Sequence, residues 1–371
     1  MTQIFLAPRR YVQGDGAVHE AGIHAARLGA KALLTGGKRA LAACAQAIKS
    51  SLKEKNIDCC QELFNGECSD SEINRLVALA KKDGADFIIA SGGGKVIDTG
   101  KVAANLLKVP VMVVPTIVAT DAPCSAVAVV YTDEGVFQRY VVLPHNPDCV
   151  LADTRIIVNA PVETFVSGMG DALATFWEAD TCARSCKPNV LTGGTTPTRS
   201  AISLARLCYD TLLEYGLQAK LAVENHCVTP AVEAIVEANT LLSGLGFESG
   251  GLAGAHSVHN GFTVLKSTHH KLHGQKVAFG TLTQLVMEGR SSDDIYEVLD
   301  FCLSVGLPVC LEDLGIDNPT PEAIRKVAEA TTAPGETIHA TWFEVTADKV
   351  ESAIWTASAM AVDYRKKRFN K

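Results

Sequence analysis

The sequence has no apolar run long enough to cross a membrane. The longest, VPVMVVPTIVA at residues 109–119, falls far short of the roughly 20 residues that a spanning helix needs, and it contains two prolines. The N-terminal MTQIFLAPRRYVQG also lacks the basic and then apolar layout of a signal peptide. We therefore expect a cytoplasmic protein with no membrane partner.

Positive charge and cysteine motifs are also scarce. The net charge of −7 gives no long-range attraction for nucleic acid or for an anionic membrane surface. One basic run, RKKR at residues 365–368, is interpreted as a solvated helix end. The twelve cysteines match no zinc-finger or zinc-ribbon spacing and do not make a disulfide scaffold in so long a chain. We expect reduced, mostly buried thiols.

The length of 371 residues exceeds the usual size of one hydrophobic core, which predicts two domains. In the first part, apolar runs such as KALLTGG and ADFIIASGGG alternate with helix-type segments, which predicts parallel βαβ units. SAVAVVYTDEGVFQRYVVLP instead predicts a β-hairpin. From about Pro161 onward, apolar residues recur every three or four positions, as in helices. We expect a Rossmann-like α/β domain at residues 1–158 and an all-α domain at residues 159–371, without a flexible linker or an internal repeat.

A run of glycines separates a predicted strand from a predicted helix at Gly92, Gly93, Gly94 and Lys95. Glycine lets backbone N–H groups approach a phosphate closely, and a helix N-terminus favours an anion. The pattern fits neither G-x-G-x-x-G nor the P-loop, because Val96 follows the lysine. The turn is therefore either a tight βα connection or a phosphate-binding site.

Histidines are concentrated in one segment: five of the ten lie between His256 and His273. A catalytic zinc ion takes three protein ligands and leaves one position open. His256 and His273 would supply two nitrogens, and Asp171 a carboxylate after what reads as a Gly-Met-Gly turn. The alternatives are a His-rich surface, against which the apolar flanks GLAGA and VAFGTL argue, and an Asp171 that only caps the next helix.

Six segments together resemble the zinc-dependent, glycerol dehydrogenase branch of the iron-containing (group III) alcohol dehydrogenase superfamily. They are GGGKVIDTGK, PTIVATDAPCSA, VYTDEG, GDALATFWEA, GFESGGLAGAHSVHNGFT and HGQKVAFGTLTQL. The resemblance runs in order from the N-terminus to about residue 340. It implies a dinucleotide-binding α/β domain and a metal-binding helical domain in a dehydroquinate synthase-like architecture. It also implies a homo-oligomer, with an octamer as the suggested assembly.

The resemblance assigns the site residues. It makes Asp171, His256 and His273 the ligands of one zinc ion per subunit. It places the glycerol substrate against Asp121 and these ligands, with Asp121 and His256 as catalytic residues. It places NAD against Gly37, Gly92, Gly93, Gly94, Lys95, Val96, Ile97, Asp98, Thr116, Ser125, Val127 and Tyr131. His259, His269 and His270 are not assigned as ligands, although His259 is expected near the site. Iron-using relatives carry a fourth ligand, a histidine, where this chain has Thr175, which favours zinc.

The activity implied is the reversible, NAD-dependent oxidation of glycerol, and of other small vicinal diols, to the ketone. Zinc would assist by lowering the pKa of the reacting hydroxyl. The alternatives are a dehydrogenase of another small 2-hydroxy compound, such as a 2-hydroxy acid or butanediol, a dehydroquinate synthase-like NAD- and zinc-dependent lyase, and a non-catalytic dinucleotide sensor.

One position departs from the family. After the first long strand, relatives typically read Gly-Asp-Lys, whereas this chain reads Gly36, Gly37, Lys38, Arg39. A carboxylate at that position accepts hydrogen bonds from the adenosine ribose and repels a 2′-phosphate, so it selects NAD over NADP. We expect this chain to use NAD but to discriminate poorly against NADP.

Overall fold

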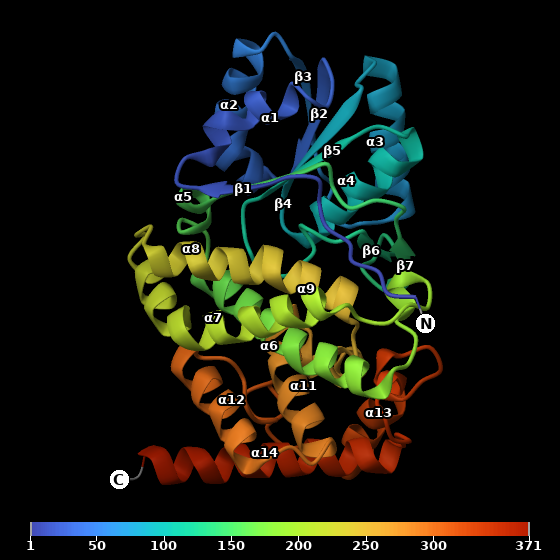
Figure 1. Ribbon diagram of the computed structural model, residues 1–371, viewed down its shortest axis with the longest axis vertical. Coiled ribbons are helices and arrows are strands. Elements are labelled where there is room, and N and C mark those ends of the chain that lie inside the picture. The colour runs from blue at the N-terminus through green and yellow to red at the C-terminus, as the bar shows by residue number, and fades with distance from the viewer. Residues whose placement is uncertain (1, 370–371) are drawn as a thin grey trace. The chain divides into compact units, whose positions relative to one another are not determined.

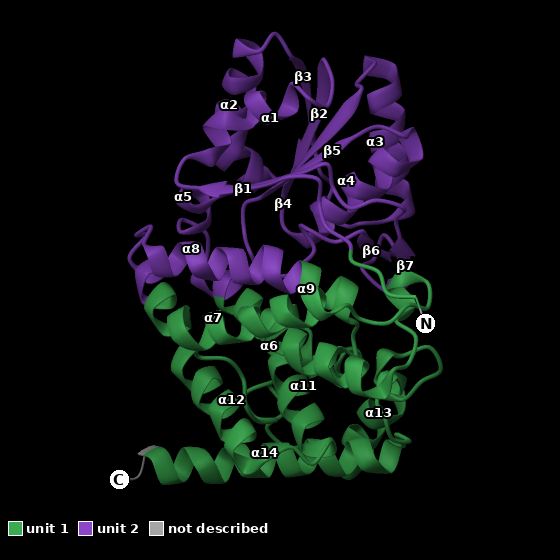
Figure 2. Ribbon diagram, viewed as in Figure 1, with its two compact units in different colours: residues 1–5, 166–220, 245–371 green, residues 6–165, 221–244 purple. Residues whose placement is uncertain are grey.

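A computed structural model describes residues 2–369. The chain forms two compact units (Figure 2). The α/β unit comprises residues 6–165 and 221–244, and the helical unit comprises residues 1–5, 166–220 and 245–371. None of the described helices is both long and apolar enough to cross a membrane.

The α/β unit is built on a six-stranded parallel sheet with the order β1-β8-β5-β4-β2-β3. Figure 1 labels most of these strands and the helices of the same unit. Its strands are β1 (Tyr11–Gly14), β2 (Lys31–Gly36), β3 (Asp58–Leu63), β4 (Phe87–Gly92), β5 (Val111–Pro115) and β8 (Cys149–Asp153). Its helices are α1 (Ala21–Ala25), α2 (Lys38–Glu54), α3 (Asp70–Asp83), α4 (Gly94–Leu107), α5 (Thr154–Ile157) and α8 (Pro230–Glu237), with short 3-10 and π segments at Ala17–Glu20 and Ala238–Leu242. The predicted Rossmann-like alternation is confirmed.

Alternate residues of each central strand face opposite layers of helices. Leu34 of β2 and Ile89 of β4 pack with α1 and α2, whereas Leu33 and Ile88, one position earlier, pack with α3 and α4. Because both faces are covered, these strands are continuous apolar runs instead of alternating ones. This double burial fixes the register of the sheet, and therefore the position of the loops at its carboxyl edge.

The predicted hairpin is also confirmed. It consists of β6 (Val127–Tyr131) and β7 (Phe137–Val142), which pair antiparallel with an irregularity between Val130 and Tyr131. Gly135 in its turn has a φ of 81°, a left-handed conformation that favours glycine.

The helical unit has no strand among its described residues. Its helices are α6 (Val162–Ser185), α7 (Arg199–Glu224), α9 (Ser243–Gly250), α10 (Gly254–Phe262), α11 (His273–Met287), α12 (Ser292–Val305), α13 (Pro321–Thr331) and α14 (Ala347–Phe369), with 3-10 turns at Val190–Thr192, Lys266–Thr268 and Thr337–Ala340. The N-terminal residues of α6 and α9 and the C-terminal residues of α7 belong to the α/β unit. All twelve cysteines are free thiols, and most of them are buried.

The division of the chain differs in detail from the one expected at residue 158. The α/β unit continues to residue 165 and also takes in residues 221–244, which the apolar spacing had placed with the other helices. The side chain of Glu233 explains this, because its carboxylate accepts hydrogen bonds from Gln13 and Thr154, both at 2.7 Å. Tyr11 of β1 adds a hydrogen bond of 2.7 Å to Thr240. These contacts join segments more than 70 residues apart, which local periodicity does not encode.

A buried ion pair secures the segment between β5 and β6. Lys101 of α4 lies 2.9 Å from Asp98, and its ammonium also donates to the carbonyls of Ala122 and Val127. The other oxygen of Asp98 accepts the Val129 N–H at 3.0 Å. Burial raises the pKa of Asp98, and Lys101 opposes that rise. The pair therefore ties α4 to the segment that leads into β6.

We expect Lys101→Met to lower the free energy of unfolding of the α/β unit by about 3–5 kcal/mol, because it leaves the buried carboxylate of Asp98 without its counter-charge. Urea unfolding followed by circular dichroism measures this. The exposed Lys82 of α3 provides the control, since Lys82→Met should change the same quantity by no more than ~0.5 kcal/mol. A similar small loss for both variants would contradict this account of the ion pair.

Candidate metal and dinucleotide sites

Three predicted ligands meet in the helical unit. Asp171 comes from α6, His256 from α10 and His273 from the first position of α11, and their ligand atoms all lie within 4.8 Å of one another. Oδ1 of Asp171 is 3.2 Å from Nε2 of His256 and 3.1 Å from Nε2 of His273. Two imidazoles and one carboxylate are a donor set that suits zinc.

The charges at this site favour a cation. Burial raises the pKa of Asp171, but His273 and His256 outweigh it and hold that pKa far below its usual range. Burial likewise lowers the pKa of His256, but Glu178 and Asp171 outweigh it and raise that pKa well above its usual value. Two almost fully buried carboxylates therefore stabilise a positive charge at His256, and a divalent metal ion would supply such a charge.

Glu178 orients His256, and it is a residue that the sequence analysis missed. One oxygen of its fully buried carboxylate is 2.5 Å from Nδ1 of His256. The other accepts the backbone N–H groups of Ala253 and His256, at 2.9 and 3.0 Å. With Nδ1 engaged, Nε2 is the nitrogen that faces Asp171. The available signal was spacing, since Glu178 follows Asp171 by seven residues and so lies on the same face of α6 two turns later.

The other histidines separate into two groups. Nε2 of His259 lies 3.1 Å from Nδ1 of His273, so His259 is next to the site, as expected. Burial, with His273 and Lys276 nearby, lowers the pKa of His259 well below its usual value, which keeps the ring neutral. His269 and His270 are exposed, and His269 contacts the backbone carbonyl of Thr263 at 2.9 Å. Neither belongs to the group of possible metal ligands that Asp171, His256 and His273 form among the described residues.

The reading of Asp171 as a residue that follows a turn was wrong. Gly-Met-Gly lies inside α6, and Asp171 is well within that helix. Gly170 serves helix packing instead of chain reversal. A Cβ on Gly170 would collide with the backbone of Gly274, and a Cβ on Gly274 would collide with the carbonyl of Ser167. This close approach of α6 and α11 brings Asp171 to His273.

Thr175 is the residue that the resemblance places where iron-using relatives carry a fourth ligand. It is fully buried one turn after Asp171. A Cβ on Gly246 would lie 2.5 Å from the Thr175 methyl group, and Ala205 packs against the same glycine. The space beside Thr175 is therefore filled by neighbouring backbone and side chains.

The predicted glycine turn lies at the carboxyl edge of the sheet. Gly92 ends β4, Gly93 is the N-cap of α4, and α4 begins at Gly94. No side chain caps the helix, so its first N–H groups are available to an anion. The turn borders a cavity of about 940 Å³, which is also lined by Gly37, Lys95, Val96 and Thr116. Seven of the predicted cofactor residues thus share one cavity.

The remaining predicted cofactor residues do not line this cavity. Ile97 and Asp98 are buried under the turn, and Asp98 is engaged by Lys101 and the Val129 N–H. Ser125, Val127 and Tyr131 lie on or just before β6. The ring of Tyr131 is nonetheless 5.6 Å from the Lys95 ammonium.

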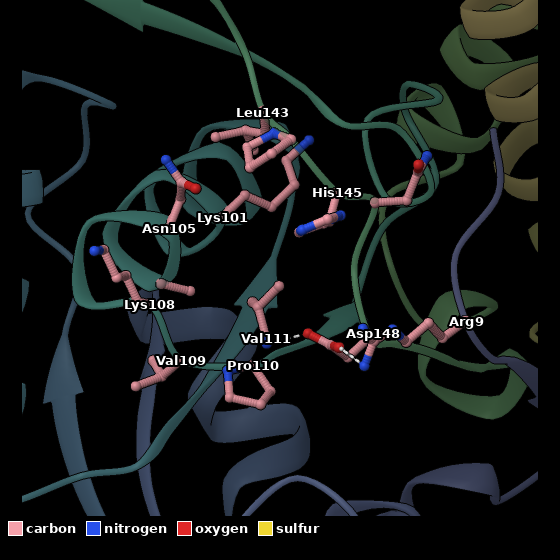
Figure 3. Close-up of a pocket in the computed structure, with 13 residues that line it drawn as sticks. Arg9, Lys101, Asn105, Lys108, Val109, Pro110, Val111, Leu143, His145 and Asp148 are labelled. Carbon is pink, nitrogen blue, oxygen red and sulfur yellow. Dashed lines mark hydrogen bonds and ion pairs between the residues drawn. The ribbon is translucent and has the colours of Figure 1, made fainter. Parts of the chain in front are cut away.

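A second cavity, of about 590 Å³, lies at the amino end of β5 (Figure 3). Asp148 accepts the Val111 N–H there at 3.0 Å and pairs with Arg9 at 3.2 Å. Dinucleotides bind outside the carboxyl ends of parallel strands, not at their amino ends. The glycine-lined cavity is therefore the candidate dinucleotide site.

Asp121, the predicted substrate contact, lies in the segment between β5 and β6. Its side chain is largely buried, and one oxygen accepts a hydrogen bond of 2.9 Å from the hydroxyl of Ser243. The carboxylate is thus held in place by the first residue of α9.

Comparisons with known proteins point to one family. The model of the iron-containing alcohol dehydrogenases matches residues 8–154. Glycerol dehydrogenase of Citrobacter freundii is 47% identical over 97% of this chain and 98% of that protein. Glycolaldehyde reductase of Halobacterium salinarum is 45% identical over the same shares. The crystal structure of glycerol dehydrogenase from Schizosaccharomyces pombe superposes with a TM-score of 0.95 at 36% identity, covering 99% of this chain and 93% of that one.

We expect Glu178→Gln to weaken zinc binding by roughly 10- to 100-fold, because the amide cannot accept both the Nδ1–H of His256 and the two backbone N–H groups. Competition with a chromogenic chelator measures the affinity without any need for turnover. Glu163→Gln, on an exposed position of the same helix, should bind zinc like the unaltered protein. Equal affinity in both variants would show that other groups fix the His256 ring.

Proposed function

This chain belongs to the glycerol dehydrogenases of the iron-containing alcohol dehydrogenase family, and from that premise we propose that it oxidises glycerol to dihydroxyacetone with NAD as the hydride acceptor. The observation that carries the proposal is the convergence of Asp171, His256 and His273 on one point in the helical unit. A cytoplasmic location and a homo-oligomeric assembly belong to the same proposal and rest on the family alone.

The metal would be zinc, held by Asp171, His256 and His273. Three ligands leave a coordination position open, and Thr175 offers no fourth imidazole. When bound, zinc supplies Lewis acidity that makes the proton of an alcohol easier to remove. Glu178 keeps Nε2 of His256 directed at the site through its 2.5 Å contact with Nδ1. His259 holds the His273 ring from the other side, at 3.1 Å.

The dinucleotide would occupy the glycine-lined cavity of the α/β unit. Its pyrophosphate would be met by the N–H groups of Gly93, Gly94 and Lys95 at the start of α4. NAD supplies the hydride chemistry, and the protein supplies binding and orientation. We also propose that five residues outside this cavity contribute to cofactor binding: Ile97, Asp98, Ser125, Val127 and Tyr131. Of these, Asp98 would act indirectly, through its ion pair with Lys101 and its bond to the Val129 N–H.

Asp121 would position the polyol. The second hydroxyl of a vicinal diol can donate a hydrogen bond to a fixed carboxylate. This contact favours diols over simple alcohols. The hydrogen bond from Ser243 restricts the Asp121 side chain to one orientation. The same site would also serve another small 2-hydroxy carbonyl compound, and the similarity to a glycolaldehyde reductase makes glycolaldehyde reduction the second candidate.

The decisive assay follows NADH absorbance with glycerol and with a panel of propanediol, butanediol, glycolaldehyde and 2-hydroxy acids. We expect turnover of glycerol that is lost on chelation and restored better by zinc than by iron(II). His273→Ala should abolish it, because two ligands do not retain the metal, whereas the exposed His270 should be replaceable by Ala without effect.

Full activity of a metal-free sample would refute the metal assignment. NADH binding without turnover of any compound would favour a dinucleotide sensor. Conversion of a phosphorylated sugar acid with no net reduction of the bound NAD would instead favour a dehydroquinate synthase-like lyase.

We expect Asp121→Ala to raise the KM for glycerol roughly 10- to 100-fold, the equivalent of one lost hydrogen bond to a charged group, while NADH binding is unchanged. Steady-state kinetics and NADH fluorescence titration measure the two effects. Ser243→Ala removes the supporting hydrogen bond but keeps the carboxylate, so its effect on KM should be smaller. Loss of NADH binding or of folding in Asp121→Ala would indicate that the carboxylate is structural.

A further inference from the structure

We infer that the dinucleotide cavity also accepts an adenosine 2′-phosphate, so that this chain binds NADP(H) as well as NAD(H). The inference rests on the proposed dinucleotide site and concerns Gly37, Lys38 and Arg39. β2 pairs with β4, with Gly36 opposite Ser91, so Gly37 follows its strand next to the glycine turn at the same edge of the sheet. In dinucleotide-binding sheets, a carboxylate there recognises the ribose of NAD, and a nearby arginine accommodates the phosphate of NADP.

The charged residues that line this cavity are all cations: Lys38, Arg39, Lys95 and Arg155. Two of them are already neutralised. Arg155 forms a two-pronged ion pair with Asp15, at 3.0 and 2.5 Å, and Lys95 pairs with Glu67. The other two, Lys38 and Arg39, are exposed, and neither forms an ion pair or a side-chain hydrogen bond with any residue in the range 2–369.

The same two residues open a long helix. α2 runs for 17 residues from Lys38, with Gly37 as its N-cap, and it has neither a capping side chain nor an acidic residue in its first turn. The first backbone bond runs from the Leu41 N–H to the Gly37 carbonyl, so the N–H groups before Leu41 have no partner within the helix. The helix dipole adds a partial positive charge at this end. Side chains and backbone thus favour an anion at the same place.

Packing does not require a glycine at position 37. Its backbone has a φ of −67° and a ψ of 159°, an extended conformation that any residue adopts. A Cβ built there meets nothing within 4 Å. An aspartate would fit, and as an N-cap residue it would also stabilise α2. The lack of a carboxylate therefore changes selectivity without serving the fold, and Gly37→Asp is a clean test because it should fold.

The test titrates the zinc-loaded protein with NADH and with NADPH and follows the fluorescence of the bound nicotinamide. We expect the two dissociation constants of the unaltered protein to lie within about tenfold of each other. Gly37→Asp should weaken NADPH binding by roughly 10- to 100-fold through repulsion and keep or tighten NADH binding. The double variant Lys38→Ala/Arg39→Ala should weaken NADPH binding by about tenfold and leave NADH binding nearly unchanged.

Lys53→Ala, an exposed lysine near the other end of α2, is the matched control and should alter neither constant. NADPH binding should also weaken more steeply with added salt than NADH binding, since it involves additional charge contacts. Tight NADH binding with NADPH more than a hundredfold weaker, and a ratio unchanged by Gly37→Asp, would overturn the inference but not the proposed function. Failure of both dinucleotides to bind would overturn the proposed dinucleotide site itself.

Discussion

The helical unit depends on how closely two helices approach each other. At Gly170 and Gly274 the backbones of α6 and α11 are so near that a methyl group on either residue would overlap the other helix. Asp171 follows the first glycine and His273 precedes the second, so the contact places a carboxylate and an imidazole 3.1 Å apart. A larger residue at either position would push the helices apart and separate the ligands. The packing of the two helix backbones therefore determines the distance between the side chains of Asp171 and His273.

Two buried carboxylates determine the electrostatics of the site. Asp171 and Glu178 bring two negative charges into the interior of the helical unit, where unpaired charges are costly. Glu178 is satisfied by an imidazole and two backbone N–H groups, so it holds His256 firmly. Oδ1 of Asp171 instead contacts Nε2 of both histidines, and these are the atoms that a metal ion would bind. Glu178 therefore orients the His256 ring, whereas Asp171 is the carboxylate that would bind the metal ion.

The fold class could be predicted from the sequence because the patterns that indicate the βαβ units and the hairpin are local. Apolar strands that end in glycine, followed by helices, predict parallel βαβ units, and the hairpin shows its own alternation. The ligand set came from a resemblance across several motifs, and the structure brings those three residues together. What local patterns missed depends on distant partners. Gly-Met-Gly looks like a turn until Gly274 is known to lie against it, and residues 221–244 join the α/β unit through contacts with Gln13 and Thr154. Glu178 required knowing that α6 continues unbroken past Asp171.

The α/β unit has unpaired positive charge on its surface, whereas the helical unit has an excess of buried negative charge. This difference indicates which kind of ligand each unit would bind. Two of the four cations that line the cavity of the α/β unit have acidic partners: Arg155 pairs with Asp15, and Lys95 pairs with Glu67. Lys38 and Arg39 are the exceptions, beside an uncapped helix start where an acidic residue would ordinarily be favourable. In the helical unit the excess is negative and buried, around His256. A buried negative excess is costly unless a cation completes it, so it argues for a metal. An exposed positive excess costs little in water, so its meaning comes from its location at the edge of a cavity that the glycine turn already makes suitable for phosphates.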